Sequence, residues 1–210
     1  MDFIKEVENL GIKLDSDKLD KFKKYFELLV EYNKVMNLTG ITDIDGVYLK
    51  HFYDSITLVK AYDFTKDISL CDVGSGAGFP SIPLKIVFPN IDVTIVDSLN
   101  KRIEFLNVVI KELGLTKIKA IHSRAEEFDH RESFDVVTSR AVANIEKLVD
   151  FTMHLVSKKG VFVAMKGNIE EELSQEVKNK LMRKYNIIQV EQFSLPKENS
   201  MRSLVVIKNK

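Results

Sequence analysis

A glycine-rich stretch at the end of an apolar run constrains the fold of this chain more than any other feature. The stretch reads Asp-Val-Gly-Ser-Gly-Ala-Gly-Phe-Pro over residues 72–80 and follows the apolar residues of 68–73. Glycines allow a tight turn between a strand and a helix, and they let a ligand approach the backbone. Free N–H groups at the start of the next helix can bind an anionic group. The stretch therefore predicts a nucleoside- or dinucleotide-binding loop in an α/β domain.

Short apolar runs alternate with amphipathic stretches from residue 68 onward, which is typical of a parallel sheet with helical crossovers. The last two runs are separated only by residues 194–202, which leave no room for a helix, so we expect them to form an antiparallel hairpin. Helices are predicted over 81–88, 100–113, 144–156 and 169–184, with Gly114 ending the second. The seven predicted strands are 68–73, 92–97, 118–123, 134–139, 160–166, 187–193 and 203–208.

Residues 1–65 show helical periodicity and no strand signal. One helix is predicted because apolar residues recur at helical spacing among charged ones, namely Leu19, Phe22, Phe26, Leu29 and Val30. Asp15 or Ser16 is placed to cap it, and a second helix is predicted over 45–61. We therefore expect an N-terminal helical region over 1–65 and a Rossmann-like domain over 66–210.

Composition excludes several classes of protein. A chain of 210 residues fits one domain with an appendage better than two small domains. No apolar run approaches the roughly 20 residues of a membrane span, and no signal peptide is apparent, so we expect a cytoplasmic protein without a membrane partner. The 31 basic and 31 acidic side chains give zero net charge, so an anion-binding surface must be a local patch. Cys71 is the only cysteine, and its apolar context predicts a buried thiol.

Details of the glycine loop favour S-adenosylmethionine over a dinucleotide. The loop is G-x-G-x-G rather than G-x-G-x-x-G, and a carboxylate at Asp72 would repel a pyrophosphate but suits a ligand with an ammonium and a sulfonium. Asp97 closes the next run, where an acid accepts hydrogen bonds from ribose hydroxyls. The alternative is a flexible turn and a helix-capping Asp97. The expected cofactor residues here are Asp72, Gly74, Ser75, Gly76, Gly78, Phe79 and Asp97.

The segment after the fourth run indicates the acceptor, because class I methyltransferases usually meet their acceptor there. We expect a loop over 138–142, which contains Arg140. This segment lacks the Asn/Asp-Pro-Pro-Tyr/Phe signature of enzymes that methylate exocyclic base amines. It also has no cysteine, which excludes the covalent mechanism of cytosine-C5 methylation. The planar fork of an arginine matches phosphate oxygens or the O6/N7 edge of guanine, which suggests an anionic or guanine-like acceptor.

Six motifs follow one another along the chain, at 37–39, 51–55, 72–84, 97–102, 139–141 and 166–167. In this order they resemble the motifs of the RsmG (GidB) family of bacterial small-subunit rRNA guanine-N7 methyltransferases, and the resemblance extends over residues 20–208. It implies a class I S-adenosylmethionine-dependent fold, with a seven-stranded, mostly parallel sheet and a C-terminal antiparallel hairpin. It also implies methylation at N7 of guanine 527, in the 530 loop of 16S rRNA. The partner would be the rRNA, the 30S subunit or an assembly intermediate, and we expect a monomer without a metal site.

The resemblance also assigns residues to sites. Ala125 and Glu126 would lie beside the adenine, although the cluster over 123–127 is equally consistent with solvated charges. The expected catalytic residues are Arg140, which is also expected at the cofactor, His51 and Asp54; the last two are alternatively a structural pair on one helix face. RNA binding predicts a basic face, whereas a small-molecule or protein methyltransferase predicts an open apolar pocket; an inactive nucleotide-binding module is also possible. The expected RNA-binding residues are Asn37, Lys101, Arg102, Arg124, Lys166 and Arg202.

Overall fold

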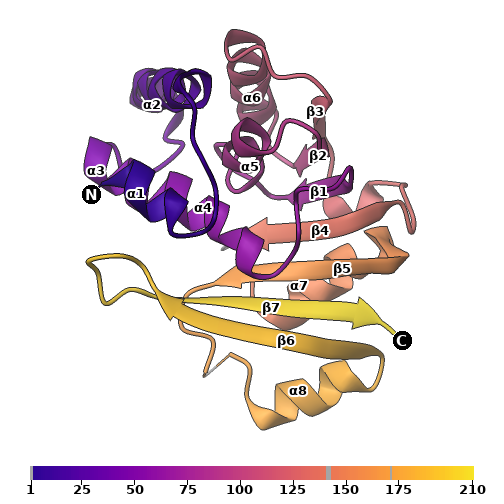
Figure 1. Ribbon diagram of the computed structural model, residues 1–210. Coiled ribbons are helices and arrows are strands. Elements are labelled where there is room, and N and C mark those ends of the chain that lie inside the picture. The colour runs from indigo at the N-terminus through magenta and orange to yellow at the C-terminus, as the bar shows by residue number, and fades with distance from the viewer. Residues whose placement is uncertain (1, 141–142, 171) are drawn as a thin grey trace.

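A single seven-stranded sheet organises the chain in the computed structural model, which describes every residue except 1, 141–142 and 171. The strand order is β3-β2-β1-β4-β5-β7-β6 (Figure 1). Neighbours from β3 through β5 pair in parallel, and β7 pairs antiparallel with both β5 and β6, which confirms the predicted fold and hairpin. The strands are β1 (Ser69–Val73), β2 (Asp92–Asp97), β3 (Ile118–His122), β4 (Phe134–Arg140), β5 (Val156–Lys166), β6 (Tyr185–Ser194) and β7 (Met201–Asn209).

Helices α5 (Ser81–Val87) and α6 (Asn100–Glu112) end within one residue of the predicted bounds. Helix α7 (Ile145–Thr152) continues as the 3-10 helix η4 (Met153–Leu155), and η3 (Ala125–Glu127) follows β3. The helix predicted over 169–184 is wrong at its start, because α8 covers only Gln175–Met182. The Ser174 hydroxyl caps α8 by accepting from the Val177 amide. The apolar residues before this cap, Ile169 and Leu173, are buried, but neither lies in a helix.

The N-terminal region is helical, as predicted. It contains α1 (Phe3–Glu8), α2 (Ser16–Met36), α3 (Ile44–Val47), the π-helix η1 (Tyr48–Tyr53), α4 (Asp54–Ile56) and the 3-10 helix η2 (Thr57–Lys60). The Asp15 carboxylate caps α2 by accepting from the Lys18 amide at 2.9 Å, and Asn37 ends that helix in the left-handed conformation. The helix predicted over 45–61 is thus an unbroken run of α, π and 3-10 turns. Such π segments occur frequently at functional sites.

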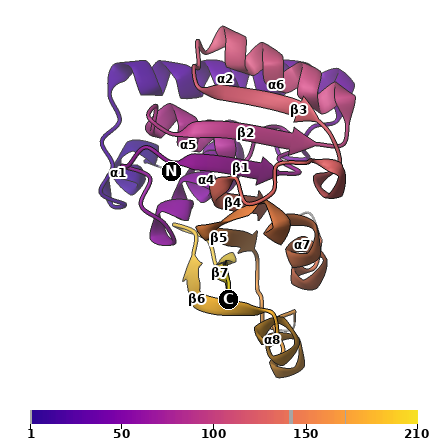
Figure 2. The same ribbon diagram turned by 90° about the vertical axis from the view of Figure 1, so that its right-hand side faces the viewer.

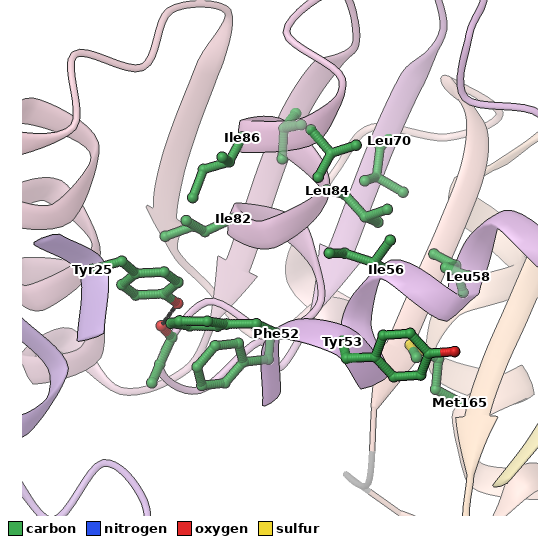
Figure 3. Packing of buried hydrophobic residues seen from close by; sticks show 14 of the residues in the cluster. Tyr25, Phe52, Tyr53, Ile56, Leu58, Leu70, Ile82, Leu84, Ile86 and Met165 are labelled. Carbon is green, nitrogen blue, oxygen red and sulfur yellow. Dashed lines mark hydrogen bonds between the residues drawn. The ribbon is translucent and has the colours of Figure 1, made fainter. Parts of the chain in front are cut away.

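Of the helices before residue 66, α2 packs against α5 and α6, and α4 packs against α5. Helices α2 and α6 lie together over the β1–β3 half of the sheet, and α8 lies at the far end, beside β6 (Figures 1 and 2). Buried residues from before and after residue 66 belong to one hydrophobic cluster, in which Tyr25, Phe52 and Ile82 pack together (Figure 3). The carboxyl ends of β4 and β5 point toward the N-terminal helices (Figure 1). That arrangement encloses a cavity at this end of the sheet.

Candidate active site

A cavity of about 600 Å³ lies at the carboxyl ends of the parallel strands, where open α/β sheets bind their ligands. The glycine loop forms one part of its wall, the N-terminal segment a second, and the ends of β4, β5 and the hairpin a third. The lining residues fall within 38–41, 50–57, 74–79, 97–102, 165–167 and 202–204, together with Arg140 and Phe193.

All three glycines of the glycine loop have positive φ: 72° at Gly74, 62° at Gly76 and 102° at Gly78. A Cβ at Gly76 would meet no atom within 4 Å, so this position leaves room for a ligand. A Cβ at Gly78 would lie 2.8 Å from the hydroxyl of Tyr25. Gly78 is therefore needed for close packing against α2, and it does not line the cavity.

Asp97 presents a buried carboxylate at the end of β2, on the cavity wall. Its Oδ1 accepts from the Leu99 amide at 3.0 Å, and its Oδ2 accepts from the Gly76 amide at 3.1 Å. Arg102 also donates to Oδ2, at 3.3 Å. A carboxylate offers about four lone-pair sites, so these bonds leave acceptor capacity for a ligand. Arg102, which was predicted to bind RNA, is thus paired with this carboxylate.

Asp72 is fully buried at the end of β1 and does not line the cavity. Its Oδ2 accepts from the Ser81 amide at 3.1 Å, which fixes the start of α5. Burial raises the pKa of Asp72 to about 7. Nearby, the Ser75 hydroxyl is buried, lines the cavity and has no hydrogen-bond partner among the described residues. That hydroxyl is suited to a polar group of a bound ligand.

Arg140, Asp54 and Arg202 form a cluster that we call the arginine cluster, in which Asp54 is buried and both arginines are half-buried. Arg140 donates through Nη1 to the Lys50 carbonyl at 2.9 Å and to Asp54 Oδ2 at 3.0 Å. The Nε of Arg202 donates to Asp54 Oδ1 at 2.9 Å. One carboxylate thus faces two guanidinium groups, and the cluster adds a net positive charge to the cavity wall. The loop expected over 138–142 begins later, because β4 extends through Arg140; residues 141 and 142 lie outside the described residues.

His51 and Phe79 lie against the arginine cluster. The two rings stack with their centroids 4.5 Å apart, and the Arg140 guanidinium lies 5.0 Å from the Phe79 centroid. The Nδ1 of His51 is 3.3 Å from Arg140 Nη2, and its Nε2 is 2.8 Å from the Thr39 hydroxyl. Burial, with a contribution from the Arg140 charge, lowers the pKa of His51 to about 4. The imidazole is therefore neutral near pH 7.

The cations that were predicted to contact RNA differ in their surroundings. Lys166 donates to the Ala143 carbonyl and pairs with Glu172 at 2.8 Å, with its side chain only 8% exposed. Lys101 donates to the Met36 carbonyl at 3.1 Å. The described residues that line the cavity do not include Asn37, Lys101, Arg124, Ala125 or Glu126. Arg102, Arg140, Lys166 and Arg202 line the cavity.

Asn33 is a site residue that the sequence patterns do not reveal. Its side-chain Oδ1 accepts from the amides of Leu38 and Thr39, at 2.6 and 2.8 Å, and its Nδ2 donates to the Thr39 carbonyl at 2.9 Å. These bonds fix the loop that places the Thr39 hydroxyl beside His51. Phe193 of β6 also lines the cavity, and its sequence signal is only that of strand alternation.

The part of the chain that the structure describes holds no group of three or more His, Cys, Asp or Glu side chains that could bind a metal ion. Within the same residues, no helix is long and apolar enough to cross a membrane.

Comparison with known proteins gives one family and one fold. The family model described as rRNA small subunit methyltransferase G (GidB) matches residues 18–204. A protein of that name from Exiguobacterium sibiricum is 49% identical, over 99% of this chain and 90% of the relative. Among solved structures, a SAM-dependent methyltransferase from Aquifex aeolicus aligns with a TM-score of 0.61 and 15% identity, over 81% of this chain and 96% of that one. M. jannaschii TYW2 in complex with AdoMet aligns with a TM-score of 0.57 and 15% identity, over 70% and 71%. At these identities the structures establish the fold alone.

Proposed function

The chain belongs to the rRNA small subunit methyltransferase G family, and on this premise we propose that it methylates N7 of guanine 527 in 16S rRNA. Family membership supports methyl transfer to small-subunit rRNA. The finer proposal rests on one observation, the arginine cluster in the cavity that the glycine loop also lines. We further propose that the protein acts in the cytoplasm, as a monomer, on the rRNA within a ribosomal particle.

S-adenosylmethionine is the methyl donor, and the residues of the cavity fit it. Space beside Gly76 admits a ligand against the backbone, and the Asp97 carboxylate has acceptor capacity for ribose hydroxyls. The partnerless Ser75 hydroxyl offers a further polar contact. When bound, this cofactor supplies a methyl group on a positively charged sulfonium. Asp72 would act indirectly, because it holds the start of α5 and is shielded from the cavity.

The arginine cluster supports a guanine or phosphate acceptor. Arg140 uses Nη1 and Nη2 for its contacts with Lys50, Asp54 and His51, which fixes the plane of its guanidinium. Arg202 donates from Nε to Asp54 and from Nη1 to the Met201 carbonyl. Planar guanidinium groups held in this way match the O6/N7 edge of guanine or phosphate oxygens. We propose that Asp54 orients both arginines and that they orient the acceptor.

Transfer to N7 requires no general base, because N7 carries a lone pair and no proton. The neutral His51 need not exchange protons; it supports Phe79 and accepts or donates within the network around Arg140. The chain's contribution is to hold the nucleophile and the methyl group in line and to exclude water. Positioning of this kind can supply up to about 7–11 kcal/mol of the barrier.

The test is to map N7-methylguanosine in 16S rRNA from cells with and without this protein. Loss of the modification only at guanine 527, with recovery on re-expression, is the expected result. Purified protein should also transfer tritiated methyl groups to 30S particles from the deletion strain and not to wild-type particles. A modification lost at another nucleotide would replace the proposed target. Transfer to a protein or small molecule alone would contradict the rRNA acceptor.

A further inference from the structure

Tyr25 of α2 is a buried polar side chain that reaches from the N-terminal region into the glycine loop. It is fully buried, and its hydroxyl donates to the Ala77 carbonyl at 2.5 Å. Ala77 lies between Gly76 and Gly78 and lines the cavity. The hydroxyl thus holds the backbone of the cavity wall from behind, and Tyr25 does not itself line the cavity.

The surroundings of Tyr25 show how closely the loop packs on α2. Its ring stacks on Phe52 with the centroids 5.2 Å apart and lies 5.6 Å from that of Phe79 (Figure 3 shows Tyr25 and Phe52). A side chain at Gly78 would bring a carbon to 2.8 Å from the hydroxyl, which no real contact tolerates. The absence of a side chain at Gly78 therefore permits the bond between Tyr25 and Ala77. Burial raises the pKa of Tyr25 well above its ordinary value, so the hydroxyl remains a donor.

The loop needs such a restraint because three glycines with positive φ give it little intrinsic order. If the loop adopts its binding-competent form only part of the time, the apparent Kd rises by the inverse of that fraction. A single buried hydrogen bond, worth about 0.5–1.5 kcal/mol net, changes such a fraction by about two- to twelvefold.

We propose that Tyr25 is a positioning residue, which holds the glycine loop in its cofactor-binding form through the Ala77 carbonyl. Helix α2 is then part of the machinery that binds the cofactor. This inference rests on the part of the proposed function that places S-adenosylmethionine at the glycine loop, and it does not depend on which nucleotide is methylated.

Tyr25→Phe tests the inference, because it removes the hydroxyl and keeps the ring packed on Phe52. The matched control is Tyr32→Phe on the same helix, where the half-buried ring packs 5.5 Å from Phe105 of α6. For Tyr25→Phe we expect the Kd for S-adenosylmethionine from calorimetry, and the KM for it, to rise about threefold to tenfold. At saturating cofactor, kcat should stay within about twofold, because the missing bond acts before the chemical step. Tyr32→Phe should change none of these values.

The outcomes separate a positioning role from a structural one. A lower melting temperature with an unchanged Kd would make Tyr25 a structural residue and would overturn the inference. A fall in kcat at saturating cofactor with an unchanged Kd would also overturn it. Wild-type protein that binds S-adenosylmethionine but methylates no rRNA, together with the raised Kd of Tyr25→Phe, would support the inference while overturning the proposed acceptor.

Discussion

Arg140 makes more contacts within the protein than a side chain needs if its only role is to contact a substrate. Its guanidinium contacts the Lys50 carbonyl, Asp54, His51 and the face of Phe79. The proposed catalytic role and a structural role therefore coincide at one side chain. A substitution of Arg140 should lower both activity and stability, and the relative size of the two losses should depend on the residue that replaces it.

Arg140→Lys should separate the two roles. A lysine can still pair with Asp54, but a single ammonium cannot reproduce the planar set of bonds. We expect methyl transfer to 30S particles to fall about 100-fold or more, because a misplacement of about 1 Å near the chemistry has that effect. The free energy of unfolding should fall by only about 1–3 kcal/mol, and the Kd for S-adenosylmethionine should change little. A tritiated-methyl assay, a urea titration and calorimetry measure the three quantities; undiminished transfer would remove Arg140 from the catalytic residues.

His51 and Asp72 should give opposite pH dependences of stability. The pKa of His51 is lowered from 6.5 to about 4, so the unfolded state binds the extra proton and stability falls as pH falls from about 6.5 to 4. The pKa of Asp72 is raised from 3.8 to about 7, so the native state binds the extra proton and stability falls as pH rises from about 4 to 7. In the wild-type protein the two contributions largely cancel between pH 4 and 6.5.

Single variants should expose each contribution. Relative to wild type, His51→Gln should gain stability as pH falls from 6.5 to 4.5, and Asp72→Asn should lose it, each by up to about 1.4 kcal/mol per pH unit. Urea unfolding at a series of pH values measures both slopes. Curves that run parallel to wild type would show that neither group titrates in this range.

The sequence predicted residues of this site to different extents, for physical reasons. The positions of Asp97 and Gly76 can be predicted from local spacing, because one lies at the end of a strand and the other in the turn that follows a strand. Arg102 and Lys166 remain predicted RNA contacts, and the sequence patterns did not indicate that each pairs with an acid five or six residues away, Asp97 or Glu172. Tyr25 is 52 residues from its acceptor, and no periodicity identifies such a partner. Periodicity and motif spacing do not predict contacts between residues that are far apart in the sequence.

At the scale of elements, predictions were best where one strong local signal sets a boundary. Asp15 caps α2, and Gly114, with a φ of 59°, follows the end of α6. The start of α8 was predicted too early, because Ile169 and Leu173 have helical spacing but are buried from non-helical backbone before the Ser174 cap. The periodicity predicts one helix over 45–61, but it does not reveal the π-helical turns of η1 within that segment.

Asp54 joins three elements that are far apart in sequence, since it begins α4, pairs with Arg140 of β4 and pairs with Arg202 of β7. Asp54→Asn should leave two partly buried guanidinium groups without their carboxylate. Removing one partner of a buried ion pair costs about 3–5 kcal/mol, so we expect a large drop in the free energy of unfolding together with lost methyl transfer.

The control for that variant is Lys180→Ala, which breaks the exposed pair with Glu146 on α7. Exposed pairs contribute about 0–1 kcal/mol, so this change should be nearly silent in the same urea titration. Equal effects of the two substitutions would show that the arginine cluster does not hold the hairpin and β4 to the N-terminal segment.

At the scale of the whole molecule, charge neutrality makes the salt dependence of rRNA binding informative. Most of the cations expected at the RNA are balanced within the protein: Arg102 by Asp97, Lys166 by Glu172, and Arg140 with Arg202 by one shared carboxylate. The ion pairs found among the described residues do not include Lys101 or Arg124. Among the cations predicted to contact RNA, the charge that is not balanced in this way is the excess charge of the arginine cluster together with Lys101 and Arg124.

Binding of undermethylated 30S particles should therefore depend on salt only moderately. Each phosphate contact on a single-stranded region contributes a log-log slope near −0.7, so one to three contacts predict a slope between about −0.7 and −2. Arg124→Gln should weaken binding and reduce the slope by about one contact, because it removes a charge but leaves the cavity wall intact. Filter binding at several salt concentrations measures both, with cofactor affinity as the control for folding. A slope near zero would favour an uncharged acceptor, whereas a slope steeper than about −4 would require a cationic surface away from the cavity and would contradict this account of the RNA interface.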